Sequence, residues 1–377
     1  MKLYEFQAKE IFRKEKIPCP KERLVSSLEE GKSAVSEIGF PCVLKAQVLV
    51  GGRGKAGGIK IVEKEEDFST ALESIFSLRI KDLPVEKVLI SEKVEIEREL
   101  YLSIIIDRRL AKPIILASPF GGMDIEEIAK EKPKSIIKEV IDPLLGLLPY
   151  QCRRVGFQLF PGEETLLNKF SSLLMALAKI FFSYDAQLVE INPLVISKNG
   201  EFFALDAKMI LDDNAFFRHP EWAEYKSFEE ESEAEAKQEG LSYVKLSGEI
   251  GSIVNGAGLA MATLDLINRY GAQAANFLDI GGSSSPEKTK KALEIITKDK
   301  KVRVILLNIF GGITRCDDVA KGILSFLEEK RVNLPIIVRL VGTNYEIAQS
   351  LLKDAPVIFV PTMKEAVKKA SEIAKSM

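Results

Sequence analysis

The last third of the chain, from about residue 240, alternates short apolar runs with amphipathic segments in a regular order. The spacing of apolar residues predicts helices at about 259–269, 286–298, 317–330, 345–353 and 364–375. The intervening runs predict strands with the sequences SYVKL, GSIVN, ANFLDI, VRVILLNIF, LPIIVRLVG and PVIFVP. This alternation indicates a parallel sheet covered by helices on both faces, which binds ligands at the carboxyl ends of its strands.

The first 240 residues mix these patterns and divide into two regions. Up to about residue 100, the pattern predicts helices over Tyr4–Lys14 and Glu66–Leu78 and strands CVLKAQVLV, IKIV and VEKVLISEKV. The second region has strands LYLSIIID and PIILAS, a long helix over about Leu166–Phe182, and a hairpin of AQLVEINPLVIS and EFFALDAKM.

A glutamate-rich stretch, Glu229–Glu239, ends the second region, and such charge runs are typical of solvated helices or linkers. We use it as the domain boundary. The sequence therefore predicts one domain over residues 1–238, with a small subdomain over 20–98, and a second domain over residues 239–377.

Composition narrows the class of protein. With 377 residues the chain is too long for one ordinary core, and its formal net charge of −2 lacks the basic excess of a nucleic-acid-binding protein. No apolar run reaches the roughly 18 residues that span a bilayer, and the N-terminal segment is too charged for a signal peptide. We expect no membrane contact and a cytoplasmic location. The single histidine, His219, excludes a multi-histidine metal site.

A glycine-rich segment, residues 51–58, carries the first candidate chemistry. Gly52, Gly54 and Gly57 match G-x-G-x-x-G, but the strand IKIV follows, whereas the dinucleotide fingerprint and the P-loop both open a helix. A glycine loop between two antiparallel strands can cover a triphosphate with bare backbone N–H groups, as in protein kinases. Lys45, on the preceding strand, can point at phosphate from below.

The predicted hairpin carries the second candidate. Glu190 and Asn192 are two residues apart on a strand and therefore share a face. If Lys198–Gly200 forms a three-residue loop with its glycine in the left-handed conformation, Asn192 lies opposite Asp206 and Glu190 opposite Lys208. An amide oxygen beside a carboxylate suits magnesium, which takes oxygen ligands.

The register of this hairpin has an alternative. A two-residue turn at Asn199-Gly200 would shift the pairing by one residue and place Asp206 opposite Pro193. The sequence leaves both registers open.

Ten short motifs along the whole chain resemble the β subunit of succinyl-CoA ligase, also called succinyl-CoA synthetase, of the ADP-forming type. They are YEFQAKEIF, GGRGKAGG, RELYL, GGMDIEE, EINPLV, LDAK, NGAGLAM, NFLDIGG, NIFGGITRCD and VRLVGTN. The resemblance implies an α/β and α+β multidomain protein, with an ATP-grasp fold followed by a flavodoxin-like parallel α/β CoA-ligase domain.

The resemblance also implies roles for individual residues of the first domain. Asn192 and Asp206 would hold Mg²⁺, and Glu190 would contact a phosphohistidine as a catalytic residue. The nucleotide phosphates and the nucleoside would lie against Lys45, Gly52, Arg53 and Gly54, and against Glu92, the backbone near Val94, and Glu99.

In the second domain, the resemblance implies that the acyl substrate lies against Asn255, Gly312, Ile313 and Thr314. The strand and helix around them would point a helix N-terminus at this substrate and at the phosphohistidine. Both ATP and GTP remain open as the nucleotide, because the chain between Arg79 and Val85 is shorter than the loop usual in the family.

The family's reaction is a reversible step of the tricarboxylic acid cycle. It passes phosphate from ATP or GTP to a histidine and then to succinate, after which CoA forms the thioester. His219 lies in FFRHPEW, outside any glycine-rich or strand-end context, and is interpreted as a surface or capping residue. We therefore expect an α subunit, in an αβ or α2β2 complex, to supply the phosphohistidine and most of the CoA site.

Three alternatives remain beside this interpretation. A malate-CoA ligase β subunit shares very similar motifs. A carboxylate–amine ligase or a biotin-dependent carboxylase would share the ATP-grasp fold but would not need the second domain, residues 239–377. A non-enzymatic nucleotide-binding regulator is disfavoured because Lys45, Asn192 and Asp206 are all intact.

Overall fold

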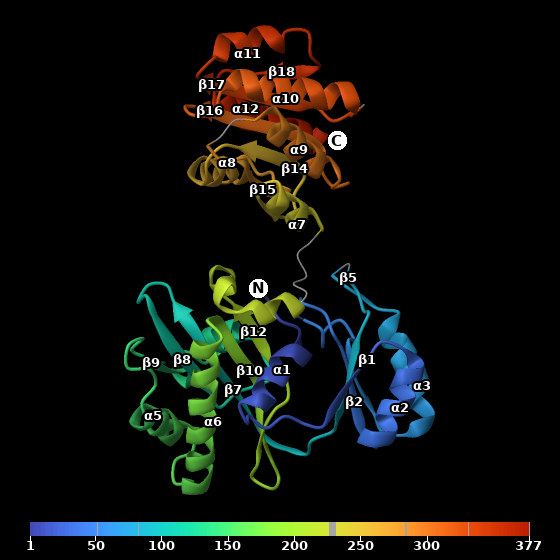
Figure 1. Ribbon diagram of the computed structural model, residues 1–377, viewed down its shortest axis with the longest axis vertical. Helices are drawn as coiled ribbons and strands as arrows, with labels where there is room; N and C mark the ends of the chain where they lie inside the picture. The colour runs from blue at the N-terminus through green and yellow to red at the C-terminus, as the bar shows by residue number, and fades with distance from the viewer. Residues whose placement is uncertain (51, 82, 226–230, 283–284, 331, 377) are drawn as a thin grey trace. The chain divides into compact units, whose positions relative to one another are not determined.

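The computed structural model describes residues 1–377 except 51, 82, 226–230, 283–284, 331 and 377. The chain forms two compact units, Met1–Phe228 and Glu229–Met377 (Figure 1). The division falls at the start of the glutamate-rich stretch, and the described part of that stretch forms helix α7 (Glu231–Gln238). Ala236 of α7 is buried in the core of the second unit, so this helix is not the solvated linker that its charge suggests.

The smaller sheet of the first unit is antiparallel, with strand order β1-β6-β2-β3. Its strands are β1 (Glu22–Val25), β2 (Cys42–Ala46), β3 (Ile59–Val62) and β6 (Val88–Glu92). Apolar side chains of helices α2 (Leu28–Ile38) and α3 (Glu65–Phe76) share its core. The short segment between Arg79 and Val85 forms a two-stranded ribbon, β4 (Arg79–Ile80) and β5 (Leu83–Pro84).

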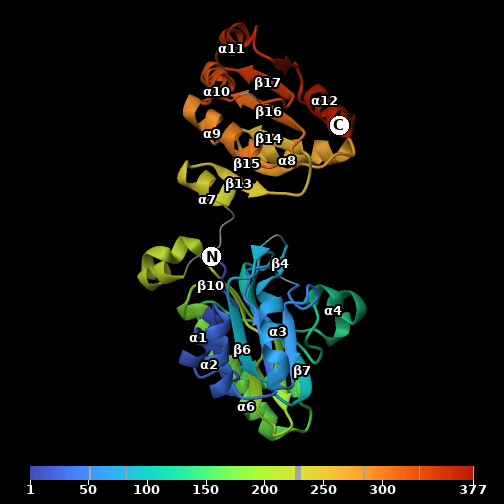
Figure 2. The same ribbon diagram turned by 90° about the vertical axis from the view of Figure 1, so that its right-hand side faces the viewer.

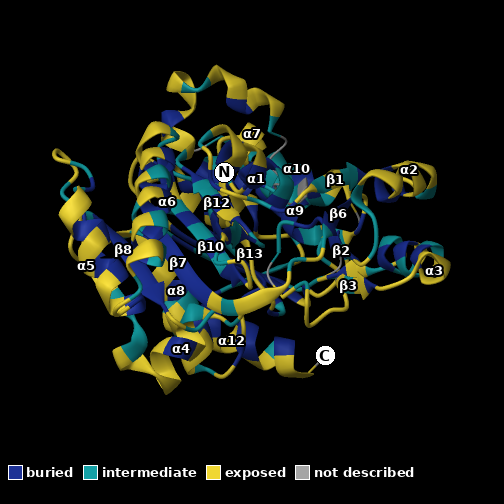
Figure 3. Ribbon diagram, turned by 90° about the horizontal axis from the view of Figure 1, so that it is seen from below, coloured by how far each residue is buried: buried dark blue, intermediate teal, exposed yellow. Residues whose placement is uncertain are grey.

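The larger sheet of this unit has the order β11-β10-β7-β8-β9, with β12 also paired to β10. Helices cover it, and Figure 3 shows its central strands buried and the outer side of α5 exposed. The strands are β7 (Ile96–Asp107), β8 (Lys112–Ser118), β9 (Ile137–Val140), β10 (Ala186–Ser197), β11 (Phe202–Ala204) and β12 (Lys208–Leu211). The helices are α1 (Glu5–Lys14), α4 (Ile125–Glu131), α5 (Pro149–Leu159) and α6 (Glu164–Ser183), with short 3-10 helices η1 (Pro133–Ser135), η2 (Asp213–Arg218) and η3 (Pro220–Glu224).

Helix α6 is long and apolar enough to cross a membrane by length and composition alone. Its buried residues, including Leu174, Leu177 and Phe181, belong to the core shared with β10. Core packing therefore accounts for its apolar character, which is weak evidence for a membrane span.

The second unit holds one sheet with the order β13-β15-β14-β16-β17-β18, between two layers of helices (Figure 2). The strands are β13 (Ser242–Lys245), β14 (Ile250–Val254), β15 (Asn276–Asp279), β16 (Val304–Gly311), β17 (Ile336–Gly342) and β18 (Val357–Phe359). One core layer includes α7, α9 (Pro286–Thr297), α10 (Cys316–Glu329) and α11 (Tyr345–Leu351), and the other α8 (Ala257–Arg269) and α12 (Met363–Ser376).

The predicted parallel sheet is confirmed for five strands and wrong for one. Strand β13 at the edge runs antiparallel to β15, because only residues 246–249 connect it to β14, too few for the crossover that parallel strands require. In the first unit, the predicted strand CVLKAQVLV ends at Ala46, where the backbone begins to turn toward the glycine loop.

Two helical glycines test how closely the second unit is packed. A Cβ on Gly322 of α10 would lie 2.5 Å from the Pro286 carbonyl oxygen and 2.7 Å from Thr289 Cβ, whereas one on Gly258 of α8 meets nothing within 4 Å. We expect Gly322→Ala to lower the free energy of unfolding by about 1–3 kcal/mol. Gly258→Ala should cause no loss, and a gain of at most about 1 kcal/mol. Urea unfolding followed by circular dichroism measures both, and equal effects would contradict the packing.

Candidate functional site

The glycine loop joins β2 to β3, which run antiparallel with Lys45 paired to Ile59. The Ala46 N–H donates to the Gly58 carbonyl at 2.7 Å, and the Gly58 N–H donates to the Arg53 carbonyl at 2.9 Å. Gly52 and Gly57 have φ of +87° and +76°, a conformation that favours glycine. The prediction of a strand-to-strand loop is confirmed for its described residues. Gly51 lies outside the described residues.

The register of the hairpin is the one that opposes Asn192 to Asp206. Gly200 is left-handed, with φ of +70°, and the Ser197 N–H donates to the Glu201 carbonyl at 2.8 Å. Leu194 pairs with Ala204 and Glu190 with Lys208, which is one constant register. Asp206 lies in the interruption between β11 and β12, so the register places it opposite Asn192 at the point where the partner strand is broken.

A buried ion cluster links the two sheets of this unit. We call it the Glu5 cluster, and its members are Glu5, Lys9, Glu22, Lys45, Arg53 and Asp206. Glu5 lies 2.9 Å from Lys9 Nζ, 3.1 Å from Lys45 Nζ and 2.8 Å from Arg53 Nη1. Lys45 also donates to the carbonyl of Leu205 on the hairpin. The cluster therefore brings the glycine loop, β2 and the hairpin together on the first turns of α1.

Arg53 connects two carboxylates of this cluster, Glu5 on α1 and Asp206 on the hairpin. Its Nη2 lies 2.8 Å from both carboxylate oxygens of Asp206, and its Nη1 also donates to the Ala46 carbonyl at 3.2 Å. Its side chain is only 11% exposed. The exposed Lys55 of the same loop, by contrast, lies 3.7 Å from Glu127 and outside the cluster.

The charges of the cluster set its titration. Burial alone would raise the pKa of Glu5, but Lys45, Lys9 and Arg53 outweigh it and hold that pKa well below its usual range. Burial lowers the pKa of Lys45, and Glu5 opposes this shift. Burial also acts to lower the pKa of Arg53, but Asp206 and Glu5 reverse its effect and raise that pKa. The carboxylates thus keep Arg53 charged and oppose the effect of burial on the pKa of Lys45.

Sequence reasoning missed Glu5 and Lys9, the buried centre of this cluster. Both lie on α1, four residues apart, and the side chains are 1% and 0% exposed. An i,i+4 Glu–Lys pair is ordinarily a solvated surface pair, so spacing alone could not reveal its burial.

Asn192 and Asp206 offer one amide and one carboxylate, a ligand set that suits Mg²⁺. The Gly122 N–H donates to Asn192 Oδ1 at 2.8 Å, and Asn192 Nδ2 donates to the Met123 carbonyl at 3.0 Å. Among the described residues, no group of three or more His, Cys, Asp or Glu side chains could hold a metal. A site here would therefore rely on few protein ligands, and the assignment stays a prediction.

Glu190 lies beside this pair on β10. Tyr101 on β7 donates its hydroxyl to Glu190 Oε2 at 2.9 Å. Burial raises the pKa of Glu190, while Lys208 and Tyr101 act to lower it and Asp206 acts to raise it. Glu190 is therefore a half-buried carboxyl within electrostatic range of Asp206.

The three nucleoside candidates do not join the Glu5 cluster. Glu92 Oε1 accepts from the Lys21 N–H at 2.8 Å at the edge of the small sheet, and Val94 follows in the chain leaving that sheet. Glu99 is exposed on β7, where it pairs with Val195. Their place in a nucleoside pocket stays a prediction.

In the second unit, three strand ends meet around Asn255. Its Nδ2 donates to the Phe310 carbonyl at 2.8 Å and to Thr314 Oγ1 at 3.1 Å, and its Oδ1 accepts from the Phe310 N–H at 2.8 Å. Thr314 is buried, whereas Ile313 is 86% exposed and a Cβ on Gly312 would meet open space. The structure thus brings the four candidate residues together ahead of α10.

Asp279, which sequence reasoning missed, shapes this edge. Its Oδ1 accepts from the Gly256 N–H at 2.6 Å and from the Gly281 N–H at 2.7 Å. A carboxylate directly after a buried strand, within NFLDIGG, was the available signal.

At the start of α10, Asp317 accepts from Arg315 and from Asn344 Nδ2. The hydrogen bond from Arg315 lowers the pKa of Asp317 below its usual range, so this carboxylate stays charged at the positive end of the helix.

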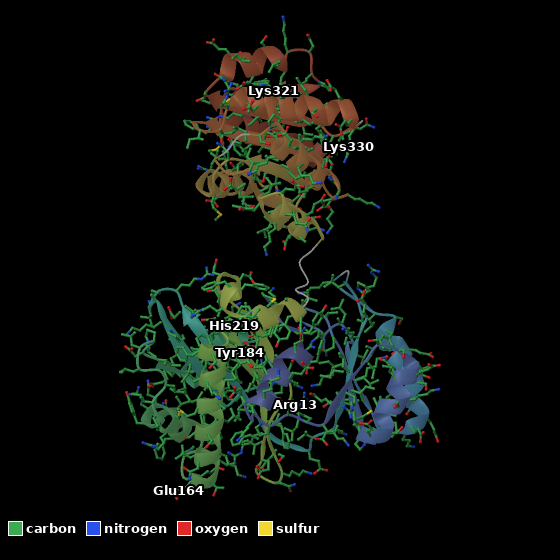
Figure 4. The ribbon with its side chains drawn as sticks, viewed as in Figure 1. Arg13, Glu164, Tyr184, His219, Lys321 and Lys330 are labelled. Atoms are coloured by element: carbon green, nitrogen blue, oxygen red, sulfur yellow. The ribbon has the colours of Figure 1, made fainter. Side chains whose placement is uncertain are left out.

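His219 is held in place by its neighbours and lies beside Tyr184, whose ring is stacked with it (Figure 4). It forms the junction of η2 and η3, which agrees with the capping interpretation. Its Nε2 lies 2.8 Å from Asp185 and its ring stacks on Trp222 at 4.1 Å, so the side chain is 13% exposed and is not a surface group. These contacts give the histidine a structural role.

Glu5→Gln tests the dependence of the first unit on its buried carboxylate. Removing one partner of a buried ion pair costs about 3–5 kcal/mol. Because the folded pKa of Glu5 is depressed, its contribution is present above the unfolded pKa, about 4.3, and is lost as pH falls toward the folded value. We therefore expect wild type and Glu5→Gln to differ fully at pH 7 and progressively less in acid.

Fluorescence of Trp222, the single tryptophan and a core residue of this unit, measures that difference during urea unfolding. Glu63→Gln is the matched control, since Glu63 forms an exposed pair with Lys93, and its loss should cost less than about 1 kcal/mol. Similar losses in both variants would contradict a central role for Glu5.

Two family models match the chain. A model described as ATP-grasp domain matches residues 2–196, and one described as CoA-ligase matches residues 253–373. Among solved structures, ATP citrate lyase from Methanothrix soehngenii in complex with citrate and coenzyme A has a TM-score of 0.70 and 21% identity, covering 98% of this chain and 99% of that one. This likeness shows the fold.

Curated relatives match over the full length. A succinate–CoA ligase (ADP-forming) subunit beta of Bacteroides thetaiotaomicron is 47% identical over 370 residues, covering 97% of this chain and 98% of that protein. Two subunits with the same description are each 46% identical. The one from Herpetosiphon aurantiacus covers 100% of both chains, and the one from Aquifex aeolicus covers 99% of both. The chain therefore belongs to the family of ADP-forming succinate–CoA ligase β subunits, in which an ATP-grasp fold precedes a CoA-ligase domain.

Proposed function

We propose that this chain provides the nucleotide, magnesium and succinate sites of an ADP-forming succinate–CoA ligase, and that a separate α subunit provides the phosphohistidine and most of the CoA site. The reaction joins succinate and CoA as ATP is converted to ADP and phosphate. The observation that carries the proposal is the convergence of Lys45, Arg53 and Asp206 in one cluster, while His219 is held by Asp185 and Trp222. The chain thus has the groups to hold a triphosphate but no available histidine to receive its phosphoryl group.

The first half-reaction uses the first unit. The cations of Lys45 and Arg53, with the backbone of Gly52 to Gly54, bind the phosphates of ATP. Asn192 and Asp206 would hold Mg²⁺, which when bound neutralises phosphate charge. Glu190, with Tyr101 fixing its Oε2, positions the incoming histidine ring by accepting its N–H. ADP leaves as the γ-phosphoryl group forms its bond to the ring nitrogen.

The second half-reaction uses the second unit. The open backbone at Gly312 and the N-terminus of α10 favour an anion, because free N–H groups and the helix dipole point the same way. Asn255, fixed by Phe310 and Thr314, borders this position. A succinate carboxylate bound here would accept the phosphoryl group from the histidine, and CoA would then displace phosphate.

The division between two chains is tested by labelling with ATP that carries ³²P in the γ position. We expect the complex with the α subunit to carry the label on the α subunit, and the isolated chain to take up none and to form no acyl-CoA. His219→Gln should label the complex as fully as wild type, because His219 has a structural role. Label on this chain, or acyl-CoA formed by the chain alone, would refute the proposal.

The same complex decides the finer points of substrate and assembly. Rates with ATP and GTP test the nucleotide, and rates with succinate and malate test the acid. Light scattering distinguishes an αβ complex from α2β2. We expect ATP and succinate to give the higher rates, in line with the relatives' description.

Gly312→Val tests the assignment of the second unit. A side chain at Gly312 would meet no protein atom within 4 Å, so the fold should survive while the space for the acyl group is filled. We expect phosphorylation by ATP to stay within about twofold of wild type, and dephosphorylation by succinate and CoA to slow by about 100-fold, the size of effect expected for misplaced reactants. Loss of phosphorylation by ATP in this variant would show that the division of labour is wrong.

A further inference from the structure

The carboxylate of Asp206 has two possible partners, Arg53 and a metal ion. Under the proposed function it is the one carboxylate of the magnesium site, yet both of its oxygens lie 2.8 Å from Nη2 of Arg53. Its Oδ1 also accepts from the Ala207 N–H at 2.8 Å. A divalent cation at Asp206 would therefore lie beside a guanidinium that is already paired with the same carboxylate, and like charges repel strongly at such distances.

The guanidinium of Arg53 also has two possible partners, a phosphate and Asp206. It is the cation of the glycine loop, expected to contact phosphate, and it reaches from the small sheet to the hairpin of the large one. Its Nη1 stays paired with Glu5 at 2.8 Å, and this contact fixes one side of the guanidinium group. Only its Nη2 must change partner, from the two oxygens of a carboxylate to the oxygens of a phosphate.

We propose that Arg53 and the metal ion compete for Asp206, and that a bound nucleotide opens the metal site by drawing Arg53 onto its phosphates. This inference rests on the proposed function and adds an order to it. Without nucleotide, the ion pair between Arg53 and Asp206 prevents divalent cations from binding to this carboxylate. With nucleotide, Arg53 transfers to phosphate, Asp206 is released, and metal and nucleotide bind as a coupled pair. By reciprocity, the metal strengthens nucleotide binding by the same factor.

The proposal has a counterintuitive consequence, which separates it from a simple phosphate-binding role. Removing the guanidinium should weaken nucleotide binding but strengthen metal binding in the absence of nucleotide. A residue that only contacted phosphate would leave nucleotide-free metal binding unchanged.

The experiment uses the complex with its α subunit and Mn²⁺, which takes the same oxygen ligands and is counted by the electron paramagnetic resonance of its free form. Wild type should bind Mn²⁺ weakly alone and at least about tenfold more tightly with ADP. Arg53→Met should bind Mn²⁺ about tenfold more tightly than wild type without nucleotide, and gain less from ADP. Arg53→Lys, which lacks the fork, should lie between them.

Two further variants make the outcomes distinguishable. Lys55→Met removes an exposed cation of the same loop and should match wild type in Mn²⁺ affinity. Asp206→Asn should lose the site with and without ADP. If both Arg53 variants fold, as Trp222 fluorescence reports, and bind Mn²⁺ no more tightly than wild type without nucleotide, the competition is refuted. If Asp206→Asn keeps ADP-dependent Mn²⁺ binding, the metal assignment in the proposed function fails instead.

Discussion

The first unit depends on one buried carboxylate. Glu5 lies on α1 among Lys9, Lys45 and Arg53, with its side chain 1% exposed. Lys9 also pairs with Glu22 and Arg53 with Asp206, but the ion pair of Lys45 is with Glu5, and an unpaired buried charge costs several kcal/mol. The same cations suit a polyphosphate. The cluster satisfies its positive charge internally, and under the proposed function phosphate would replace a carboxylate as the partner of these cations.

The second constraint is the interruption opposite Asn192. The hairpin keeps one register from Leu194–Ala204 to Glu190–Lys208, but the partner strand breaks between β11 and β12. At the break, the side chain of Asp206 turns to Arg53 and the carbonyl of Leu205 accepts from Lys45. Strand pairing on both sides holds the polar groups in position, and the gap frees them from the ladder. Leu205 donates its N–H to the Pro193 carbonyl at 3.2 Å, but Pro193 has no N–H to return, so the Leu205 carbonyl is left for Lys45 and Lys9.

Much of this arrangement was predictable from local pattern. Period and composition predicted the glycine loop between strands, the three-residue turn at Gly200 and nearly every helix of the second unit, because each depends on neighbours in sequence. Helix α2 was missed although Ser27 caps it by accepting from the Glu30 N–H. The Glu5 cluster was not predictable, because its members are up to about 200 residues apart and only tertiary packing shows which charges are buried. The antiparallel direction of β13 follows from its short connection to β14, a signal that the alternation of strands and helices hid.

The two units divide the chemistry according to what each can bury. The charges of the first unit are paired within one cluster. Under the proposed function, a highly charged ligand would compete with the carboxylates of this cluster for the same cations. The second leaves Gly312 open and Ile313 and Phe310 largely exposed at the strand ends. Apolar side chains at such an edge are costly in water, and under the proposed division the α subunit covers them while it delivers the phosphohistidine. Under that division, an edge completed by the partner would account for a chain whose one histidine packs between Asp185 and Trp222.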